Sequence, residues 1–84
     1  MNAESVVRDA WLSCLGINSL SPDDTFFGLG GDSLSAIEVM ERVETALGIE
    51  FPLDTLFTIG TFSVVAGECA ALYEATPEAA RDNA

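Results

Sequence analysis

The stretch GLGGDSLSAIEVMERVETALG, Gly28 to Gly48, joins a glycine-rich turn to a long amphipathic pattern. Each residue of an α-helix advances about 100° around the axis. On that spacing, five apolar side chains share one face, which we expect to meet the core: Ala36, Val39, Met40, Val43 and Leu47. The stretch therefore predicts a helix from about Ser33 to Leu47 that ends at Gly48.

The opposite face of this predicted helix mixes apolar and acidic side chains. It carries Leu34, Ile37, Glu38 and Glu41, with Glu44 at its edge. A solvated helix surface with a few exposed apolar residues is the simpler interpretation. A docking patch for another protein is the alternative, because an apolar pair rimmed by carboxylates begins directly after Ser33.

Apolar residues recur at helical spacing in three more segments. The first is Ala3–Leu15, which stops at Gly16, and the second is a short helix over residues 53–57. The last helix begins near Phe62, with Thr61 as its expected N-cap. Beyond residue 75 the apolar period is lost, so we expect one domain over residues 1–75 and a flexible C-terminal tail over residues 76–84.

A long loop, residues 17–32, separates the first two predicted helices. Residues 21–24 (SPDD) indicate a turn, and we expect the rings of Phe26 and Phe27 to attach the loop to the core. No segment alternates with a period of two, so no strand is expected. The predicted fold is all-α: a small four-helix bundle of three main helices and one short one, with the long loop between helices 1 and 2.

The charge of the chain restricts its partners. The sequence contains fourteen Asp and Glu residues and three arginines, with no lysine and no histidine, so its formal net charge is −11. Binding to nucleic acid depends on Lys and Arg, so it is not expected, whereas a basic protein surface is a suitable partner. No apolar run approaches the ~20 residues that cross a bilayer and no signal peptide is visible, so we expect no membrane contact and a cytoplasmic location.

The two cysteines, Cys14 and Cys69, are far apart in the sequence and lack metal-ligand spacing. We expect free thiols in the core, with an incidental disulfide as the alternative. No metal site is predicted.

Ser33 has three possible roles: nucleophile, helix cap or attachment point. The letters GDSL at residues 31–34 also occur as the nucleophile motif of serine esterases, but a serine nucleophile needs a base, and the chain has no histidine or lysine. No catalytic residue is therefore expected, and the chain is not predicted to be an enzyme. Either Asp32 or Ser33 can cap the helix, and the flanking Gly30 and Gly31 allow a closer backbone approach than a simple cap needs.

The segment DDTFFGLGGDSLSAIEVMERVETALGIEFPLDTLF, residues 23–57, resembles the phosphopantetheine-binding carrier proteins, specifically the peptidyl carrier (thiolation) branch of non-ribosomal peptide synthesis. The resemblance implies an acyl-carrier-protein-like fold. It also implies that a phosphopantetheinyl transferase attaches the 4'-phosphopantetheine arm of coenzyme A to Ser33. Gly31, Asp32 and Leu34 flank that site.

The same resemblance implies how partners recognise the carrier. The residues expected to dock them are Phe27, Leu34, Ile37, Glu38 and Glu41. An adenylation enzyme is expected to load an aminoacyl group as a thioester on the arm, and condensation, tailoring or thioesterase enzymes to act on it afterwards. We expect a monomer. Because the sequence starts at Met1 and ends soon after the last predicted helix, we also expect a free-standing (type II) carrier, with a domain excised from a larger synthetase as the alternative.

Two alternatives stay open. The LGG motif favours the peptidyl branch, but the strong acidity is typical of acyl carriers of polyketide or fatty-acid synthesis, and many peptidyl carriers have histidine where Asp32 stands. The second alternative is an acidic helical interaction domain without a covalent cofactor, in which Ser33 only caps the helix.

Overall fold

The computed structural model describes residues 2–76, and in this range the chain forms four helices and no strand. They are α1 (Ala3–Leu15), α2 (Ser33–Leu47), α3 (Leu53–Thr58) and α4 (Phe62–Ala75). The predicted all-α fold with one short helix and one long loop is therefore confirmed. Of the predicted tail, residues 76–84, only Thr76 lies inside the described residues.

The helices begin and end close to the predicted residues, but the N-terminus of α4 is capped in a way that the sequence did not predict. Asn2 caps α1 by accepting a hydrogen bond from the Ser5 N–H (3.0 Å). Thr61 is the N-cap residue of α4, as predicted, but its side chain does not make the capping hydrogen bond that a threonine was expected to supply there. The N–H groups of Phe62 and Ser63 donate instead to loop carbonyls, over 2.9 and 3.0 Å. The loop thus supplies the acceptors that a capping side chain would have provided.

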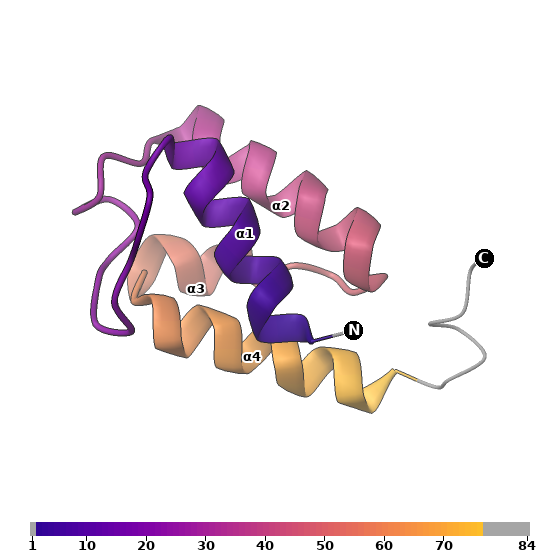
Figure 1. Cartoon of the computed structure of the whole chain (residues 1–84). Coiled ribbons are helices and arrows are strands. Elements are labelled where there is room, and N and C mark those ends of the chain that lie inside the picture. The colour runs from indigo at the N-terminus through magenta and orange to yellow at the C-terminus, as the bar shows by residue number, and fades with distance from the viewer. Residues whose placement is uncertain (1, 77–84) are drawn as a thin grey trace.

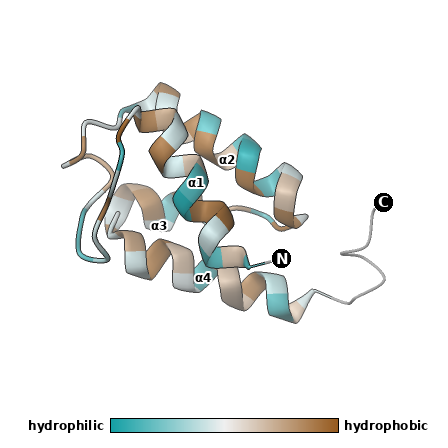
Figure 2. Cartoon of the chain, in the orientation of Figure 1, coloured by the Kyte–Doolittle hydropathy of each residue, from teal (hydrophilic) through white to brown (hydrophobic). Residues whose placement is uncertain are grey.

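The core forms where α1, α2 and α4 meet, with α1 packed against both of the others. At its centre the Trp11 ring meets the Phe26 and Phe62 rings edge-on, with centroid distances of 5.1 and 5.2 Å. Figure 2 shows alternating hydrophobic and hydrophilic bands along α2, as expected of an amphipathic helix. Four of the five core residues predicted for α2 are buried, whereas Met40 is only partly buried.

Both cysteines are free thiols, as predicted. Cys69 is fully buried in α4, and burial raises the pKa of its thiol to about 12. Cys14 is partly buried, and burial raises the pKa of its thiol as well. Neither is disposed to react as a thiolate near neutral pH.

The long loop is attached to the corner between α3 and α4. Thr25 and Thr61 form an isolated antiparallel bridge, and the Phe26 N–H donates to the Gly60 carbonyl over 2.8 Å. Phe26 is fully buried, as expected, but Phe27 remains 43% exposed, so only the first ring attaches the loop to the core. As a result the loop, the start of α2 and α3 lie together at the left end of the bundle in Figure 1, away from the N-terminus.

Candidate functional site

Ser33 is the first residue of α2, and its side chain is exposed. Asp32 is the N-cap: its Oδ1 accepts the Ser35 N–H at 2.9 Å, and the Asp32 N–H donates to the Ser35 Oγ at 2.8 Å. These two bonds form a reciprocal capping box. The Ser33 hydroxyl has no hydrogen-bond partner among the described residues.

This geometry decides between the two caps that the sequence left open. Asp32 does the capping, so the Ser33 hydroxyl is not needed to hold the helix. The N–H of Ser35 is the main reason why the pKa of the Asp32 carboxyl is lowered from 3.8, and the Ser35 hydroxyl contributes further. The carboxylate is thus held in its charged form at the positive end of the α2 dipole.

The lowered pKa of Asp32 predicts a loss of stability in acid. A carboxyl whose pKa is lower in the folded state stabilises the fold above its unfolded pKa, and this contribution is lost as the pH falls through the folded value. We expect Asp32→Asn, which keeps an acceptor oxygen but no charge, to be less stable than the parent at neutral pH. The difference should shrink as the pH falls below 3.8, the ordinary pKa of an aspartate, and through the lower pKa of the folded state. Urea unfolding of both chains over this range tests it, and a difference that does not change with pH would contradict it.

The turn before Ser33 approaches the core closely, as its glycines suggested. Gly31 lies against Phe26, and its N–H donates to the Phe26 carbonyl over 3.0 Å. A Cβ at Gly31 would overlap the Phe26 ring and come within 2.8 Å of that carbonyl oxygen. Gly30 has a φ of 97°, which L side chains rarely adopt. Ser33 is therefore presented on a turn that is packed onto a buried ring.

Large apolar side chains are exposed at the same end of the bundle. Leu34, the residue after Ser33, is 72% exposed, and Ile37 is 38% exposed. Phe27 stacks on Phe57 of α3 with a centroid distance of 5.6 Å and an angle of 21° between the rings, and Phe57 is itself 45% exposed. The exposure predicted for Leu34 and Ile37 is thus confirmed. Phe57 was missed, because in sequence it reads as one more apolar residue of a short helix.

The acidic residues of α2 divide into two groups. Glu38 and Glu41 are exposed and, in the part of the chain that is described, form no hydrogen bond or ion pair. Glu44, at the edge of the predicted face, has a structural role. Its Oε2 accepts a hydrogen bond of 2.9 Å from the Phe51 N–H, which lies beyond the end of α2 at Gly48. Only the first two carboxylates are free to meet a partner.

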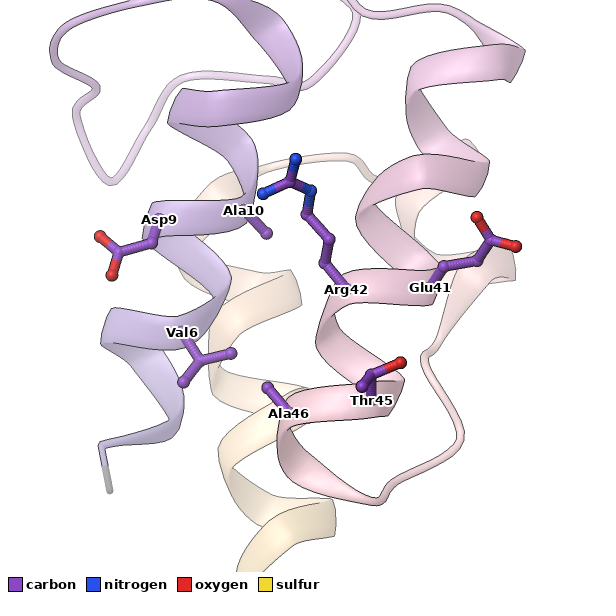
Figure 3. Close-up of a pocket in the computed structure, with 7 residues that line it drawn as sticks. All are labelled: Val6, Asp9, Ala10, Glu41, Arg42, Thr45 and Ala46. Carbon is purple, nitrogen blue, oxygen red and sulfur yellow. The ribbon is translucent and has the colours of Figure 1, made fainter.

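A groove of about 490 Å³ lies between α1 and α2, away from Ser33. Figure 3 shows the small side chains of Val6, Ala10 and Ala46 directed into the space between the helices and Arg42 extending across it, while the carboxylates of Asp9 and Glu41 point away. Ser33 does not line this groove, so it does not enclose the candidate attachment site.

The site holds one exposed hydroxyl and carboxylates, and the sequence contains no histidine that could serve as a base. Among residues 2–76 no cluster of metal-ligating side chains occurs. None of the helices described here is long and apolar enough to span a membrane. What the arrangement offers chemically is a hydroxyl that another enzyme can reach.

Comparisons with known proteins agree with this geometry. The family model described as a phosphopantetheine attachment site matches residues 5–69. L-2-aminoadipate reductase of Saccharomyces cerevisiae is 42% identical over 69 residues, which are 80% of this chain and 5% of that protein. A dimodular nonribosomal peptide synthase of Bacillus subtilis is 36% identical over 63 residues, which are 75% of this chain and 3% of that protein.

Solved structures share the fold. One chain in the structure of the phosphopantetheine transferase Sfp in complex with coenzyme A and a peptidyl carrier protein matches with a TM-score of 0.76 and 32% identity. The match covers 82% of this chain and 90% of that one. The two sequence relatives are much longer proteins, of which this chain spans only 5% and 3%.

Proposed function

Because the chain belongs to the phosphopantetheine attachment-site family, we propose that Ser33 is the residue to which its cofactor is attached. The chain is a carrier domain of the peptidyl carrier type, and 4'-phosphopantetheine is its cofactor. The observation that carries the proposal is the exposed Ser33 hydroxyl, which has no partner among residues 2–76. A phosphodiester on Ser33 would lie at the N-terminus of α2, where backbone amides and the helix dipole favour negative charge.

The attachment reaction needs no base from this chain. A bond forms between Ser33 Oγ and the phosphorus atom that bears the pantetheine group, and the diphosphate bond of coenzyme A breaks. Adenosine bisphosphate leaves with the electron pair, and the hydroxyl proton goes to a base of the phosphopantetheinyl transferase. We therefore propose that the domain catalyses no step itself, which fits the absence of histidine from its sequence.

When attached, the arm supplies a thiol that carries an aminoacyl or peptidyl group as a thioester. Tethering raises the effective concentration of that group at each partner enzyme. We propose an adenylation enzyme as the loading partner and condensation, tailoring or thioesterase enzymes as later ones. An acyl group of polyketide or fatty-acid type is the second candidate, favoured by the net charge of −11.

The docking surface proposed for these partners consists of Phe27, Leu34, Ile37, Glu38 and Glu41. To it we add Phe57, because its ring stacks on Phe27 and is similarly exposed. The apolar side chains would give close contact, while the two carboxylates would attract basic surfaces during the encounter.

Charge reversal at Glu38 tests the electrostatic part of this surface. We expect Glu38→Arg to lower kcat/KM for cofactor attachment by about tenfold at low salt. The loss should shrink toward 1 M salt, where the Debye length falls to about 3 Å. Glu74→Arg is the matched control, because it makes the same change in net charge on an exposed residue near the end of α4. Equal losses in the two variants would show that net charge, not the docking surface, steers the encounter.

The direct test of the function is intact mass spectrometry after incubation with coenzyme A and a broad-specificity phosphopantetheinyl transferase. We expect one added phosphopantetheine group per chain. If a folded chain gains no mass while a verified carrier reacts in the same tube, the attachment proposal is wrong, and the acidic interaction domain becomes the better account.

A further inference from the structure

Ser35 is an unusual residue for its position. Among the described residues it is the one buried polar residue, at 9% exposure, although it lies only two positions after the exposed Ser33. Burying a hydroxyl is unfavourable unless it forms hydrogen bonds. Within residues 2–76 the Ser35 hydroxyl is hydrogen-bonded to Asp32 alone. Its Oγ accepts from the Asp32 N–H at 2.8 Å, and its hydrogen is shared between two Asp32 acceptors, the carbonyl oxygen at 3.1 Å and Oδ1 at 3.0 Å.

These contacts fix the backbone on both sides of the exposed Ser33. The Asp32 backbone and side chain are both bonded to Ser35, so the first turn of α2 is closed around Ser33. On the other side, the turn at Gly31 is packed onto the buried Phe26 ring. The direction of the Ser33 Cα–Cβ bond is therefore fixed from both sides.

The pair also determines what the Ser33 hydroxyl can bond to. The nearest carboxylate in sequence is Asp32, and its Oδ1 is engaged by both the N–H and the hydroxyl of Ser35. An Asp32 carboxylate released from Ser35 would be available to accept the Ser33 hydroxyl itself. If the Ser33 hydroxyl donated to that carboxylate, its oxygen would be turned away from the phosphorus atom that it must attack.

We propose that Asp32 and Ser35 are a positioning pair for the modification of Ser33, an inference that rests on the proposed function. The pair keeps the Ser33 hydroxyl pointing outward and without an acceptor until the transferase binds. Misplacement of a reacting atom by about 1 Å can cost on the order of 100-fold in rate. The pair thus acts on the attack step, whereas the docking surface acts on the encounter.

The test is the kinetics of cofactor attachment to Ser35→Ala, which removes the hydroxyl but keeps the N–H bond to Asp32. We expect kcat to fall by about tenfold or more, with KM for the carrier unchanged. Hydrogen exchange should show faster exchange of the Asp32 amide while the helix content is retained, because that amide has lost its acceptor. Ser63→Ala is the matched control, because Ser63 is an exposed serine in the first turn of α4 whose side chain forms no hydrogen bond with any of residues 2–76.

A second variant keeps the outcome interpretable if Ser35→Ala folds poorly. Ser35→Thr retains a hydroxyl and should keep kcat within a few-fold of the parent value. A loss of kcat in Ser35→Thr as large as that expected for Ser35→Ala would show that the hydroxyl is not the group that matters and would overturn the pair.

The possible failures are distinct. If the parent chain accepts no phosphopantetheine, the proposed function fails and this inference fails with it. If the parent is modified and Ser35→Ala has the same kcat, in spite of faster Asp32 amide exchange, the capping box serves stability alone. That result would overturn the inference and leave Ser33 as the attachment site.

Discussion

Replacing Ser33 with alanine is expected to abolish attachment of the cofactor completely and to leave the fold intact. Alanine has no oxygen to form the phosphodiester, and no other serine stands in the LGGDSL motif. Because Asp32 and not Ser33 caps α2, stability should change by only about 0.5 kcal/mol or less. Intact mass after incubation with coenzyme A and transferase, together with urea unfolding of both chains, measures the two effects separately.

The mass half of this experiment separates the carrier from the interaction domain, and the stability half tests whether Ser33 has any capping role. An interaction domain in which Ser33 served as the cap would lose about 1 kcal/mol in Ser33→Ala. Attachment to the Ser33→Ala chain at the parent rate would show that the cofactor is bonded to another hydroxyl. Ser63→Ala, in the first turn of α4, controls for the loss of an exposed serine and should be modified like the parent.

Helix positions could be predicted from the sequence because their signals are local. The apolar period of residues 33–47 and the glycine at residue 48 define α2 without reference to any other segment, and the structure has the same bounds. The same holds for α1 and its stop at Gly16. Free-standing status, in contrast, stays a prediction, because the sequence relatives reported above contain the matching region as a small part of their length.

Features that depend on contacts between segments were not predictable. Threonine is a favoured N-cap residue, yet the first amides of α4 donate to loop carbonyls and not to the Thr61 side chain. Phe26 and Phe27 are identical neighbours in sequence, but one ring is buried against Trp11 and the other is exposed beside Phe57. The Phe26 N–H also donates to the Gly60 carbonyl, so the backbone that carries the buried ring is held by a distant segment.

The site itself was predicted in part. The position of Ser33 followed from the motif, whereas the choice of Asp32 as cap and the burial of Ser35 required the first turn of α2 to be seen in three dimensions. A signal for the pair was present, because Ser35 stands three residues after Asp32, the spacing of a capping box. The usual residue at this position of a capping box is Glu or Gln, so a serine there did not predict one.

The two adjacent phenylalanines should therefore respond to alanine in opposite ways. Phe26 is fully buried and its ring meets Trp11 edge-on, so Phe26→Ala should lower the free energy of unfolding by about 3–5 kcal/mol. That is a large part of the roughly 5–15 kcal/mol of a whole domain, and the melting temperature should fall by on the order of 15–30 °C. Attachment to Ser33 should also slow, because the Gly31 turn loses the ring on which it packs.

Phe27→Ala is the matched control one residue away. Phe27 is 43% exposed, stacks on Phe57 and meets Phe26 edge-on, so Phe27→Ala should lower the free energy of unfolding by about 1 kcal/mol. If Phe27 belongs to the docking surface, kcat/KM for attachment should still fall several-fold, mainly through KM. Thermal unfolding and attachment kinetics of the two variants thus separate a ring that supports the site from a ring that meets the partner. Similar stability losses in both variants would mean that Phe27 supports the fold and does not serve docking alone.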